Sequence, residues 1–418
     1  MTSPAPTNAG GAPRAAPRDP RRWHALVWLA LATLLGMSTW FSGTAVVRVL
    51  RVEWQLSSAA AAWLTIAVQL GFVAGSLAAA ITNLLDVVPP RRVFLAACTG
   101  AAAMNAAFAL AHGPAVGIPL RFATGFFIAG IYPTGLKVMA TWFREDRGRA
   151  LGIMVGALTI GSAAPHLVNA IGGIGWQTVV LATSGLTVLG GLLAIGAVTE
   201  GPYPFPRARF DPAQAGRVLH DRGVRLACLG YFGHMWELYA MWTWFLVFLG
   251  ESLERSGTAN VRAAAALGTA AVISAGFVGC WIGGSLSDRW GRSNTCALML
   301  AISGLCSVGI GFCFGAPWWI VLAVGLVWGA SVVADSAQFS TMVTELADPA
   351  YVGTALTLQL GIGFTLTVLT IGLIPYLRDL VTWRYAFVAL APGPILGLAA
   401  MLRLRGLPEA RGLAGGRG

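Results

Sequence analysis

The sequence predicts an all-α integral membrane protein with twelve transmembrane helices arranged as two six-helix bundles. Of its 418 residues, 56% are hydrophobic and only 11% are charged, and the mean hydropathy is +0.70. A soluble domain carries roughly 25% charged residues, so a water-soluble core of this size would lack a polar coat. Twelve apolar stretches approach the roughly 20 residues that a helix needs to cross a bilayer, and one long polar stretch divides them into six plus six.

The predicted helices occupy nearly all of the chain between residues 23 and 402. We expect them at about 23–47, 60–82, 92–112, 116–139, 148–170 and 175–198, and then at about 224–249, 265–285, 295–314, 317–338, 352–374 and 381–402. This order gives a first bundle over 23–198 and a second bundle over 224–402. Because twelve crossings return the chain to its starting side, both termini are expected on the same side of the membrane.

The remaining segments have compositions typical of regions outside a bundle. Residues 1–22 are rich in Pro, Ala, Gly and Arg and lack the apolar core of a cleavable signal peptide, so we expect a disordered cytoplasmic tail. Residues 199–223 begin with a proline-rich run that cannot continue a helix, and they are expected to form a cytoplasmic linker. Residues 403–418 are expected to form a cytoplasmic C-terminal tail.

The distribution of basic residues predicts the orientation. Of 28 Lys and Arg residues, 21 fall on the side of the termini, six fall on the opposite side, and Arg121 lies inside a stretch. Cytoplasmic loops carry such an excess, so the sequence predicts a multi-pass protein of the plasma or inner membrane with both termini in the cytoplasm. The net charge of +11 therefore reflects orientation, and we expect no nucleic-acid partner.

A short charged signature lies between the eighth and ninth stretches. It reads Gly-Ser-Leu-Ser-Asp-Arg-Trp-Gly-Arg over residues 284–292. Gly284 allows two helices to approach closely, Asp288 can cap or pair near a neighbouring helix end, and Arg289 and Arg292 can anchor to headgroups or carboxylates. With Gly291 these residues would form a cytoplasmic gating latch, although a tight basic loop with ordinary turn residues would have a similar composition.

A weaker copy of this signature lies between the second and third stretches. Asp86, Arg91 and Arg92 correspond to its charged residues, but Val87 and Pro89 depart from the pattern. Asp86 and Asp288 are 202 residues apart, at the same place in each half. Such a period indicates two repeated halves related by an axis along the membrane normal.

Two such loops in a twelve-span chain resemble those of the major facilitator superfamily of secondary transporters, in a bacterial-type form. The resemblance covers residues 23–402, and its motifs specify the superfamily without assigning a substrate branch. Arg121 also begins an Arg-x-x-x-Gly pattern that ends at Gly125, which is similar to one that many proton-coupled members carry in the fourth span. The resemblance implies alternating access, with both bundles lining one central cavity.

Two ionisable residues in the apolar stretches are candidates for that cavity. Burying an arginine in hydrocarbon costs at least about 2.5–3.5 kcal/mol, so Arg121 is expected to face a cavity or a partner unless it reaches the outer interface. Glu237 lies near the middle of the seventh stretch, where a carboxylate can exchange a proton. His234 is close to one turn away and can share its face, and Trp242 adds aromatic surface. A structural hydrogen bond is the alternative for Glu237.

Further polar residues within the stretches are weaker candidates. Asp335 in the tenth stretch is a second titratable site, part of a cytoplasmic gate, or an ordinary interhelical hydrogen-bonding group. His166 follows Pro165, which interrupts the helix ladder and can expose carbonyl groups to a cavity. Gln359 is a polar lining candidate, as are Gln69 and Asn105.

The sequence favours a secondary active transporter of a small solute, with proton-coupled symport of a small organic or anionic metabolite preferred. A drug/proton antiporter and a non-transporting solute sensor on the same fold are the alternatives. The sequence contains no glycine-rich nucleotide loop, zinc-protease motif or nucleophile elbow, so we expect neither an enzyme nor a cofactor. The six cysteines lie within or beside apolar stretches without metal-ligand spacing, so no metal site is predicted. The expected partners are the solute, protons and the lipid bilayer, and the protein is expected to be a monomer.

Overall fold

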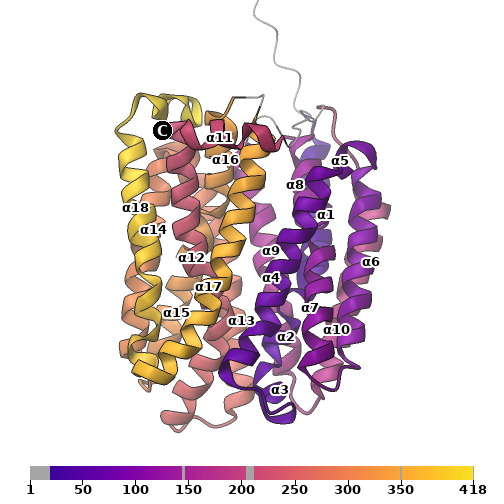
Figure 1. Cartoon of the computed structure of the whole chain (residues 1–418), viewed down its shortest axis with the longest axis vertical. Coiled ribbons are helices and arrows are strands. Elements are labelled where there is room, and N and C mark those ends of the chain that lie inside the picture. The colour runs from indigo at the N-terminus through magenta and orange to yellow at the C-terminus, as the bar shows by residue number, and fades with distance from the viewer. Residues whose placement is uncertain (1–18, 144–145, 204–210, 349–350, 418) are drawn as a thin grey trace, which may run out of the picture.

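The computed structural model of the protein describes residues 19–143, 146–203, 211–348 and 351–417. These residues form helices and their connections, and the helices stand side by side in two bundles (Figure 1). The first half of the chain, coloured indigo to magenta, forms one bundle, and the second half, coloured pink to yellow, forms the other. The predicted tail at 1–22 lies largely outside the described residues, and helix α1 begins at Arg21.

In the described residues the first bundle contains six helical segments, which we number as spans. They are span 1, made of α1 (Arg21–Gly36), the 3₁₀ turn η1 (Met37–Thr39) and α2 (Ser42–Ala45); span 2, α4 (Ser58–Ile81); span 3, α6 (Pro90–Phe108); span 4, α7 (Pro114–Ile128) with α8 (Tyr132–Ala140); span 5, α9 (Arg147–Ala170); and span 6, α10 (Trp176–Ala197). Two short helices, α3 (Val47–Glu53) and α5 (Leu84–Val87), lie in the connections.

The second bundle follows a linker that contains η2 (Pro212–Gln214) and α11 (Ala215–His220). Its spans are span 7, α12 (Arg222–Arg255); span 8, α13 (Val261–Trp290); span 9, α14 (Arg292–Gly309) with η3 (Ile310–Cys313); span 10, α15 (Trp318–Ala334) with α16 (Ser336–Leu346); span 11, most of α17 (Val352–Ala386); and span 12, the end of α17 with η4 (Phe387–Leu390) and α18 (Pro392–Arg405). The 3₁₀ segment η5 (Pro408–Gly415) ends the described chain.

Several predicted stretches differ from single continuous helices. Span 1 breaks at η1, span 4 breaks before α8, and span 10 breaks at Asp335. Pro133 in the first turn of α8 explains the second break, because proline removes a backbone donor and clashes with the preceding turn. Conversely, α17 runs through two predicted stretches, which are separated at Thr382, where the backbone has a φ of 65°.

The outer surface of the bundles is suited to lipid. Eight segments of the described chain are long and apolar enough to cross a membrane, and the last of these, Val352–Arg405, is long enough for two spans. Leu229, Leu305 and Leu369 lie in three different helices and remain 45%, 73% and 60% exposed. Water would oppose this exposure, whereas hydrocarbon accommodates it.

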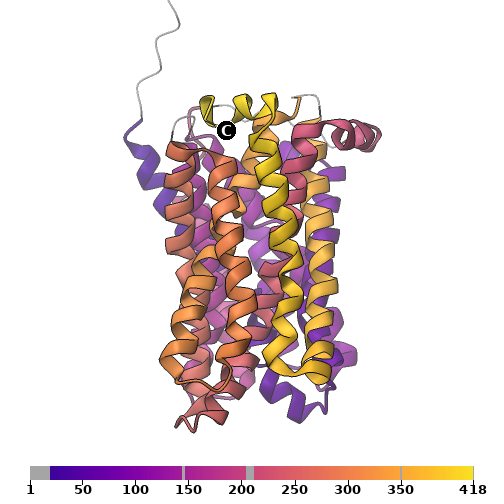
Figure 2. The ribbon, with the colours of Figure 1, turned by 90° about the vertical axis from the view of Figure 1, so that its left-hand side faces the viewer.

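The two described ends of the chain lie at the same end of the molecule. The start of α1, the linker helix α11 and the C-terminal segment all lie at this end in two perpendicular views (Figure 1, Figure 2), and α3 lies at the opposite end. We call these the linker end and the far end. An even number of spans accounts for this arrangement.

The two bundles meet along α9 and α13, which run in opposite directions. A Cβ atom at Gly152 of α9 would lie 2.6 Å from the carbonyl oxygen of Cys280 in α13, and one at Gly156 would lie 2.5 Å from the ring of Phe277. Only glycine therefore allows this approach, and small residues commonly allow membrane helices to pack this closely. We call this contact between the halves the α9–α13 seam.

Candidate functional site

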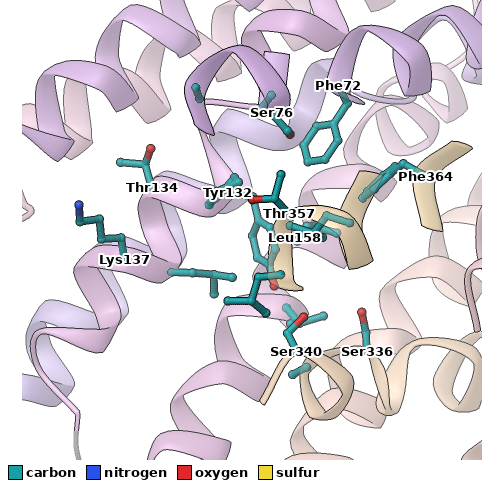
Figure 3. Close-up of a pocket in the computed structure, with 18 of the residues that line it drawn as sticks. Phe72, Ser76, Tyr132, Thr134, Lys137, Leu158, Ser336, Ser340, Thr357 and Phe364 are labelled. Carbon is teal, nitrogen blue, oxygen red and sulfur yellow. The ribbon is translucent and has the colours of Figure 1, made fainter. Parts of the chain in front are cut away.

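A cavity of about 370 Å³ lies between the two bundles. It extends from mid-span toward the linker end, where Asn83, Lys137 and Arg147 line it. Its wall combines apolar side chains with hydroxyl groups, which belong to Ser76, Tyr132, Thr134, Tyr231, Tyr239, Ser336, Ser340, Thr341, Thr344 and Thr357. Figure 3 shows residues of both bundles pointing into this space. Among the described lining residues, two are basic and none is an aspartate or glutamate.

Four aromatic rings close the inner end of the cavity, and we call them the aromatic floor. Trp40 and Phe72 come from the first bundle, and Tyr239 and Phe364 come from the second. The Phe72 and Phe364 ring centroids are 4.4 Å apart, and Trp40 stacks on Tyr239 at 5.6 Å. Each side chain is at most 5% exposed. Phe72 and Phe364 face each other in Figure 3. The floor therefore joins the two halves across the middle of the molecule.

Polar contacts hold the halves together at the far end. Arg48 of α3 forms an ion pair with Glu254 at the end of α12. Arg262 of α13 donates a hydrogen bond to Oδ1 of Asn169 in α9, over 3.1 Å. With the aromatic floor, these contacts close the far end while the cavity reaches the linker end.

Arg121 is absent from the described lining of the cavity and instead contacts polar partners, the second of the two environments expected for it. It is fully buried within the first bundle. Its guanidinium donates to the carbonyl oxygens of Thr39, Trp40 and Leu64 and to the side chains of Ser42 and Asn105. These acceptors are all uncharged.

These contacts explain both why an arginine can be buried inside the bundle and how span 1 can break at η1. The break at η1 frees backbone carbonyls that a continuous helix would satisfy internally, and buried carbonyls need partners. Arg121 supplies donors to two of them and thereby fixes the backbone of Trp40, whose ring belongs to the aromatic floor. Arg121 is thus a residue that positions the floor.

Glu237 is also absent from the described cavity lining, contrary to the expectation from the sequence. One carboxylate oxygen accepts a hydrogen bond from Nε1 of Trp328 over 2.7 Å, and the other accepts one from Oγ of Ser303 over 2.8 Å. The side chain is 1% exposed. It lies among α12, α14 and α15 inside the second bundle. This environment fits the alternative given above, in which Glu237 forms structural hydrogen bonds.

His234 and Asp335 form a buried pair directly behind the cavity wall. Nδ1 of His234 lies 2.9 Å from Oδ1 of Asp335, and their side chains are 1% and 2% exposed. Tyr231 and Ser336, which are close to them in sequence, line the cavity. The Tyr231 ring lies 5.9 Å from the His234 ring. Asp335 sits at the break of span 10, so the pair joins α12 to a point where the helix already departs from regular geometry.

The other predicted site residues lie in different environments. Trp242 lines the cavity beside the floor, and its ring packs on Tyr239 at 5.7 Å. Gln359 is fully buried, and its Oε1 accepts a hydrogen bond from Ser340 of the cavity wall over 3.3 Å. His166 is fully buried in α9, and neither ring nitrogen has a partner in the described structure.

The signature at 284–292 lies at the linker end of the α9–α13 seam. A Cβ atom at Gly148, near the start of α9, would lie 2.5 Å from Oδ1 of Asp288, so this carboxylate approaches a helix N-terminus, where negative charge is favoured. Gly284 faces the same turn of α9. Gly291 has a φ of 96°, which favours glycine, and Arg289 is exposed.

Arg292 pairs mainly with a carboxylate that the motif does not contain. Its guanidinium binds Glu345 of α16 through two hydrogen bonds of 2.8 and 2.7 Å, whereas Asp288 lies 4.0 Å away. The backbone N–H of Ala414 in η5 also donates to Glu345, and Arg417 donates to the Asp288 carbonyl. The C-terminal segment therefore packs onto this loop, which no sequence pattern indicated.

The copy of the signature in the first bundle is less completely described. The side chain of Asp86 lies outside the described residues, and Arg91 and Arg92 are exposed. Lys137 of α8 donates a hydrogen bond of 2.6 Å to the carbonyl oxygen of Leu85 in this connection. The structure therefore links this loop to the cavity lining through a residue that the sequence did not single out.

Comparisons with known proteins identify the fold. A family model described as the Major Facilitator Superfamily matches residues 28–366. The chain is similar to the structure of the proton:xylose symporter XylE bound to 6-bromo-6-deoxy-D-glucose, with 14% identity, a TM-score of 0.71, and coverage of 91% of this chain and 95% of that one. It is also similar to a D-xylose-proton symporter, with 15% identity, a TM-score of 0.72, and coverage of 93% and 99%.

A third similar structure is a bacterial homolog of the human lysosomal transporter Spinster, in an inward-facing and unoccupied conformation. It shares 15% identity and a TM-score of 0.63 over 92% of this chain and 95% of that one. The comparison with curated proteins finds no match. At these identities the likeness concerns the fold, and the all-α membrane architecture expected from the sequence is confirmed.

Proposed function

Because the chain belongs to the Major Facilitator Superfamily of secondary transporters, we propose that it couples the movement of protons to the uptake of a small organic solute. The observation that carries this proposal is the asymmetric cavity, which reaches the linker end and is closed toward the far end. The contacts that close it all join one bundle to the other. Rocking the bundles would break those contacts and form others at the linker end, which is how alternating access works in such repeated halves.

We assign proton exchange to the pair of His234 and Asp335. Both side chains are ionisable and buried, and each is adjacent in sequence to a residue of the cavity wall. Ionisable side chains inside membrane spans commonly mark proton relays. Glu237 has a weaker claim, because both of its oxygens already accept hydrogen bonds away from the cavity.

The cavity lining supports a solute with an apolar body and a polar or anionic group. The floor offers aromatic surface, the wall offers hydroxyl groups, and the charged residues of the described lining are basic. A cationic solute would find no acidic side chain among them. The two structures of xylose–proton symporters with the same fold support symport as the mode of coupling.

A drug/proton antiporter is the second candidate, favoured by the large apolar share of the lining. The two functions differ in the direction in which the substrate moves relative to the protons. In inverted membrane vesicles acidified inside, an antiporter would accumulate its substrate in exchange for protons, whereas a symporter would not. A solute sensor would transport no solute into these vesicles.

We predict that the linker end faces the cytoplasm. A cysteine at the exposed position Ala213 should then resist an impermeant thiol reagent applied to intact cells, and it should react after the cells are opened. Ala259→Cys is the matched control, because this exposed residue lies at the far end and should react in intact cells. The reverse pattern would invert the orientation.

We also predict that Asp288→Asn slows transport about tenfold without lowering the amount of protein in the membrane. The substitution removes a charge next to the start of α9, at a seam that must move, and charge near a helix N-terminus contributes about 0.3–1 kcal/mol and up to about 2 when partly buried. Asp379→Asn is the control, since Asp379 pairs with Arg378 on an exposed surface. Equal transport rates for the two variants would show that Asp288 is only a loop residue.

A further inference from the structure

The α9–α13 seam closes one side of the space between the bundles. The close contacts of two α9 glycines with α13, described above, lie in its middle. Toward the linker end, a Cβ atom at Gly148 would lie 2.5 Å from Oδ1 of Asp288. At the far end, Arg262 of α13 donates a hydrogen bond to Asn169 of α9. On this side the described helices therefore enclose the cavity along the whole length of the spans.

The opposite side lies between α4 and α17, which contact each other from the aromatic floor toward the far end. The Phe72 and Phe364 ring centroids are 4.4 Å apart. Farther toward the far end, a Cβ atom at Gly372 would lie 3.8 Å from Cδ1 of Ile66. These two contacts give the register of the helices, which run in opposite directions. The same register pairs position 76 of α4 with position 361 of α17, in the half toward the linker end.

In that half the two helices have separated. Ser76 and Gly361 both line the cavity, and a Cβ atom at Gly361 would meet no neighbouring atom within 4 Å. Ser76 of α4 and Thr357 of α17 are drawn along this space in Figure 3. We call this gap the α4–α17 portal, and its sides are formed by Ser76, Leu77, Ala80, Thr357, Leu360 and Gly361.

The rim of the portal is apolar and continues directly into the lipid-facing surface. Ala80 lines the cavity, and its neighbour Ile81 is 65% exposed. Gly361 lines the cavity, and its neighbour Ile362 is 40% exposed. Residues 58–81 and 352–377 contain no charged side chain, which suits contact with hydrocarbon. Between these helices the cavity therefore opens sideways toward lipid as well as toward the linker end.

The portal extends through one leaflet of the bilayer. From Phe72 of the floor to Ile81, α4 rises about 14 Å, which is close to half of the roughly 30 Å thickness of the hydrocarbon core. At the linker end of this path, Lys137 and Arg147 line the cavity. Lys137 lies beside the connection that follows α4, because it donates to the Leu85 carbonyl oxygen over 2.6 Å. The path thus leads from an aromatic end in the middle of the membrane to a basic end near the headgroups.

We propose that the α4–α17 portal admits a single-chain anionic amphiphile from the leaflet at the linker end into the cavity. This inference rests on the proposed transport function and names the chemical class of its solute. The alkyl chain lies on the aromatic floor and the anionic group lies beside Lys137 and Arg147, since no aspartate or glutamate is among the described lining residues. The cavity volume of about 370 Å³ is near the lower limit of ligand pockets, about 300 Å³, so one alkyl chain fits and a two-chain lipid does not.

Sideways entry suits such a solute because its chain is never exposed to water. An amphiphile dissolved in the leaflet already has its anionic group among the headgroups and its chain in hydrocarbon. Passage between α4 and α17 keeps both groups at the same depth. The chain therefore reaches the floor while the anionic group meets the basic end of the path.

Photocrosslinking tests the portal. The probe is dodecyl sulfonate with a diazirine near the end of its chain, added to proteoliposomes that contain the full-length protein. It should label Trp40 and Tyr239 of the floor. Gly361→Trp places a large side chain in the open space of the portal and should reduce this labelling severalfold. Gly185→Trp is the control, because a Cβ atom at this exposed position of α10 also meets no atom within 4 Å. Equal labelling of the floor in the two variants would overturn the portal.

A second measurement shows that Gly361→Trp leaves the cavity itself intact. In a background without the six native cysteines, Ser336→Cys should react with a water-soluble methanethiosulfonate reagent from the linker side, because Ser336 lines the cavity. The reaction should proceed equally fast when Gly361→Trp is added. A loss of this reaction together with the loss of crosslinking would mean that the whole cavity has closed, and it would contradict entry through the portal.

Probes with different head groups test the anionic class. Dodecyl trimethylammonium and dodecyl maltoside with the same diazirine should label the floor more weakly than the sulfonate. Lys137→Met should weaken labelling by the sulfonate about fivefold and leave labelling by the maltoside unchanged, and Lys137→Arg should restore it. Arg405→Met, at an exposed arginine of the linker end outside the described lining, should have no effect. Equal labelling by the ammonium probe and the sulfonate would refute the anionic class.

Transfer between leaflets separates failure of the portal from failure of the proposed function. Albumin extracts a radioactive dodecyl sulfonate from the outer leaflet only, and it thereby measures transfer in proteoliposomes. We expect transfer that depends on a pH gradient, and we expect Gly361→Trp to abolish it. If the protein concentrates water-soluble solutes but does not transfer the sulfonate, the portal is wrong and the transport function stands. If it moves neither, the transport function fails, and the portal has no solute to admit.

Discussion

Replacing Arg121 by leucine is expected to prevent most of the protein from reaching a stable folded state. The side chain donates to three backbone carbonyls and to Ser42 and Asn105 in a fully buried environment. Each polar group that loses its partner while buried costs about 1–3 kcal/mol. The summed loss is comparable to the roughly 5–15 kcal/mol by which proteins are stable. Thermal unfolding of the detergent-solubilised protein should show the change.

Two further variants make this result specific. Arg384→Leu removes an exposed arginine that packs on Phe312, and it should leave the unfolding temperature nearly unchanged. Arg121→Lys keeps the charge but lacks the planar fork that reaches several acceptors, so it should fold partially and transport poorly because Trp40 is no longer held. Wild-type stability of Arg121→Leu would contradict the role assigned to this arginine.

Replacing Asp335 by asparagine is expected to abolish accumulation driven by a pH gradient while exchange of solute across the membrane continues. The amide keeps the size and part of the hydrogen bonding of a protonated carboxyl but cannot release a proton. The imidazole of His234 then faces an amide instead of a carboxylate. Proteoliposomes with and without an imposed pH difference should show the loss of accumulation, by more than tenfold.

Glu237→Gln is the comparison that decides between the two carboxylates. Trp328 can donate to the amide oxygen, and Ser303 can turn its hydroxyl to accept from the amide nitrogen, because it already has the Leu300 carbonyl as an alternative acceptor. We therefore expect Glu237→Gln to keep coupled transport. If Glu237→Gln uncouples transport and Asp335→Asn does not, the coupling site is Glu237, as the sequence alone suggested.

The membrane class and the superfamily could be predicted from sequence because the bilayer imposes simple rules. A span must be long and apolar, and both properties can be read from composition. The breaks in spans 1 and 10 cannot be predicted from the length and composition of a span. The break at η1 is possible because Arg121, some 80 residues away, pairs with the freed carbonyls, and this depends on tertiary structure.

The same limit explains why the sequence left the positions of the site residues open. For Arg121 the sequence left open a cavity or a partner, and for Glu237 a cavity or a structural hydrogen bond, because sequence does not show which face of a helix meets the cavity and which meets its own bundle. The aromatic floor was missed because Trp40, Phe72 and Phe364 come from three distant helices. One signal was available, because Trp40 precedes a polar run at 42–44 inside an apolar stretch, which suggests an interrupted helix.

The measurement that tests the central claim most directly is uptake of a whole-cell metabolite pool into proteoliposomes that contain the purified protein. An inward proton gradient should drive one solute or a few related solutes to higher concentration inside than outside, as followed by mass spectrometry. Dissipating the gradient should remove this accumulation, and protein-free liposomes should show none. If no solute crosses the membrane faster with the protein than without it, the protein does not transport solutes in response to a proton gradient. That result would contradict the proposal of a proton-driven carrier that works by alternating access.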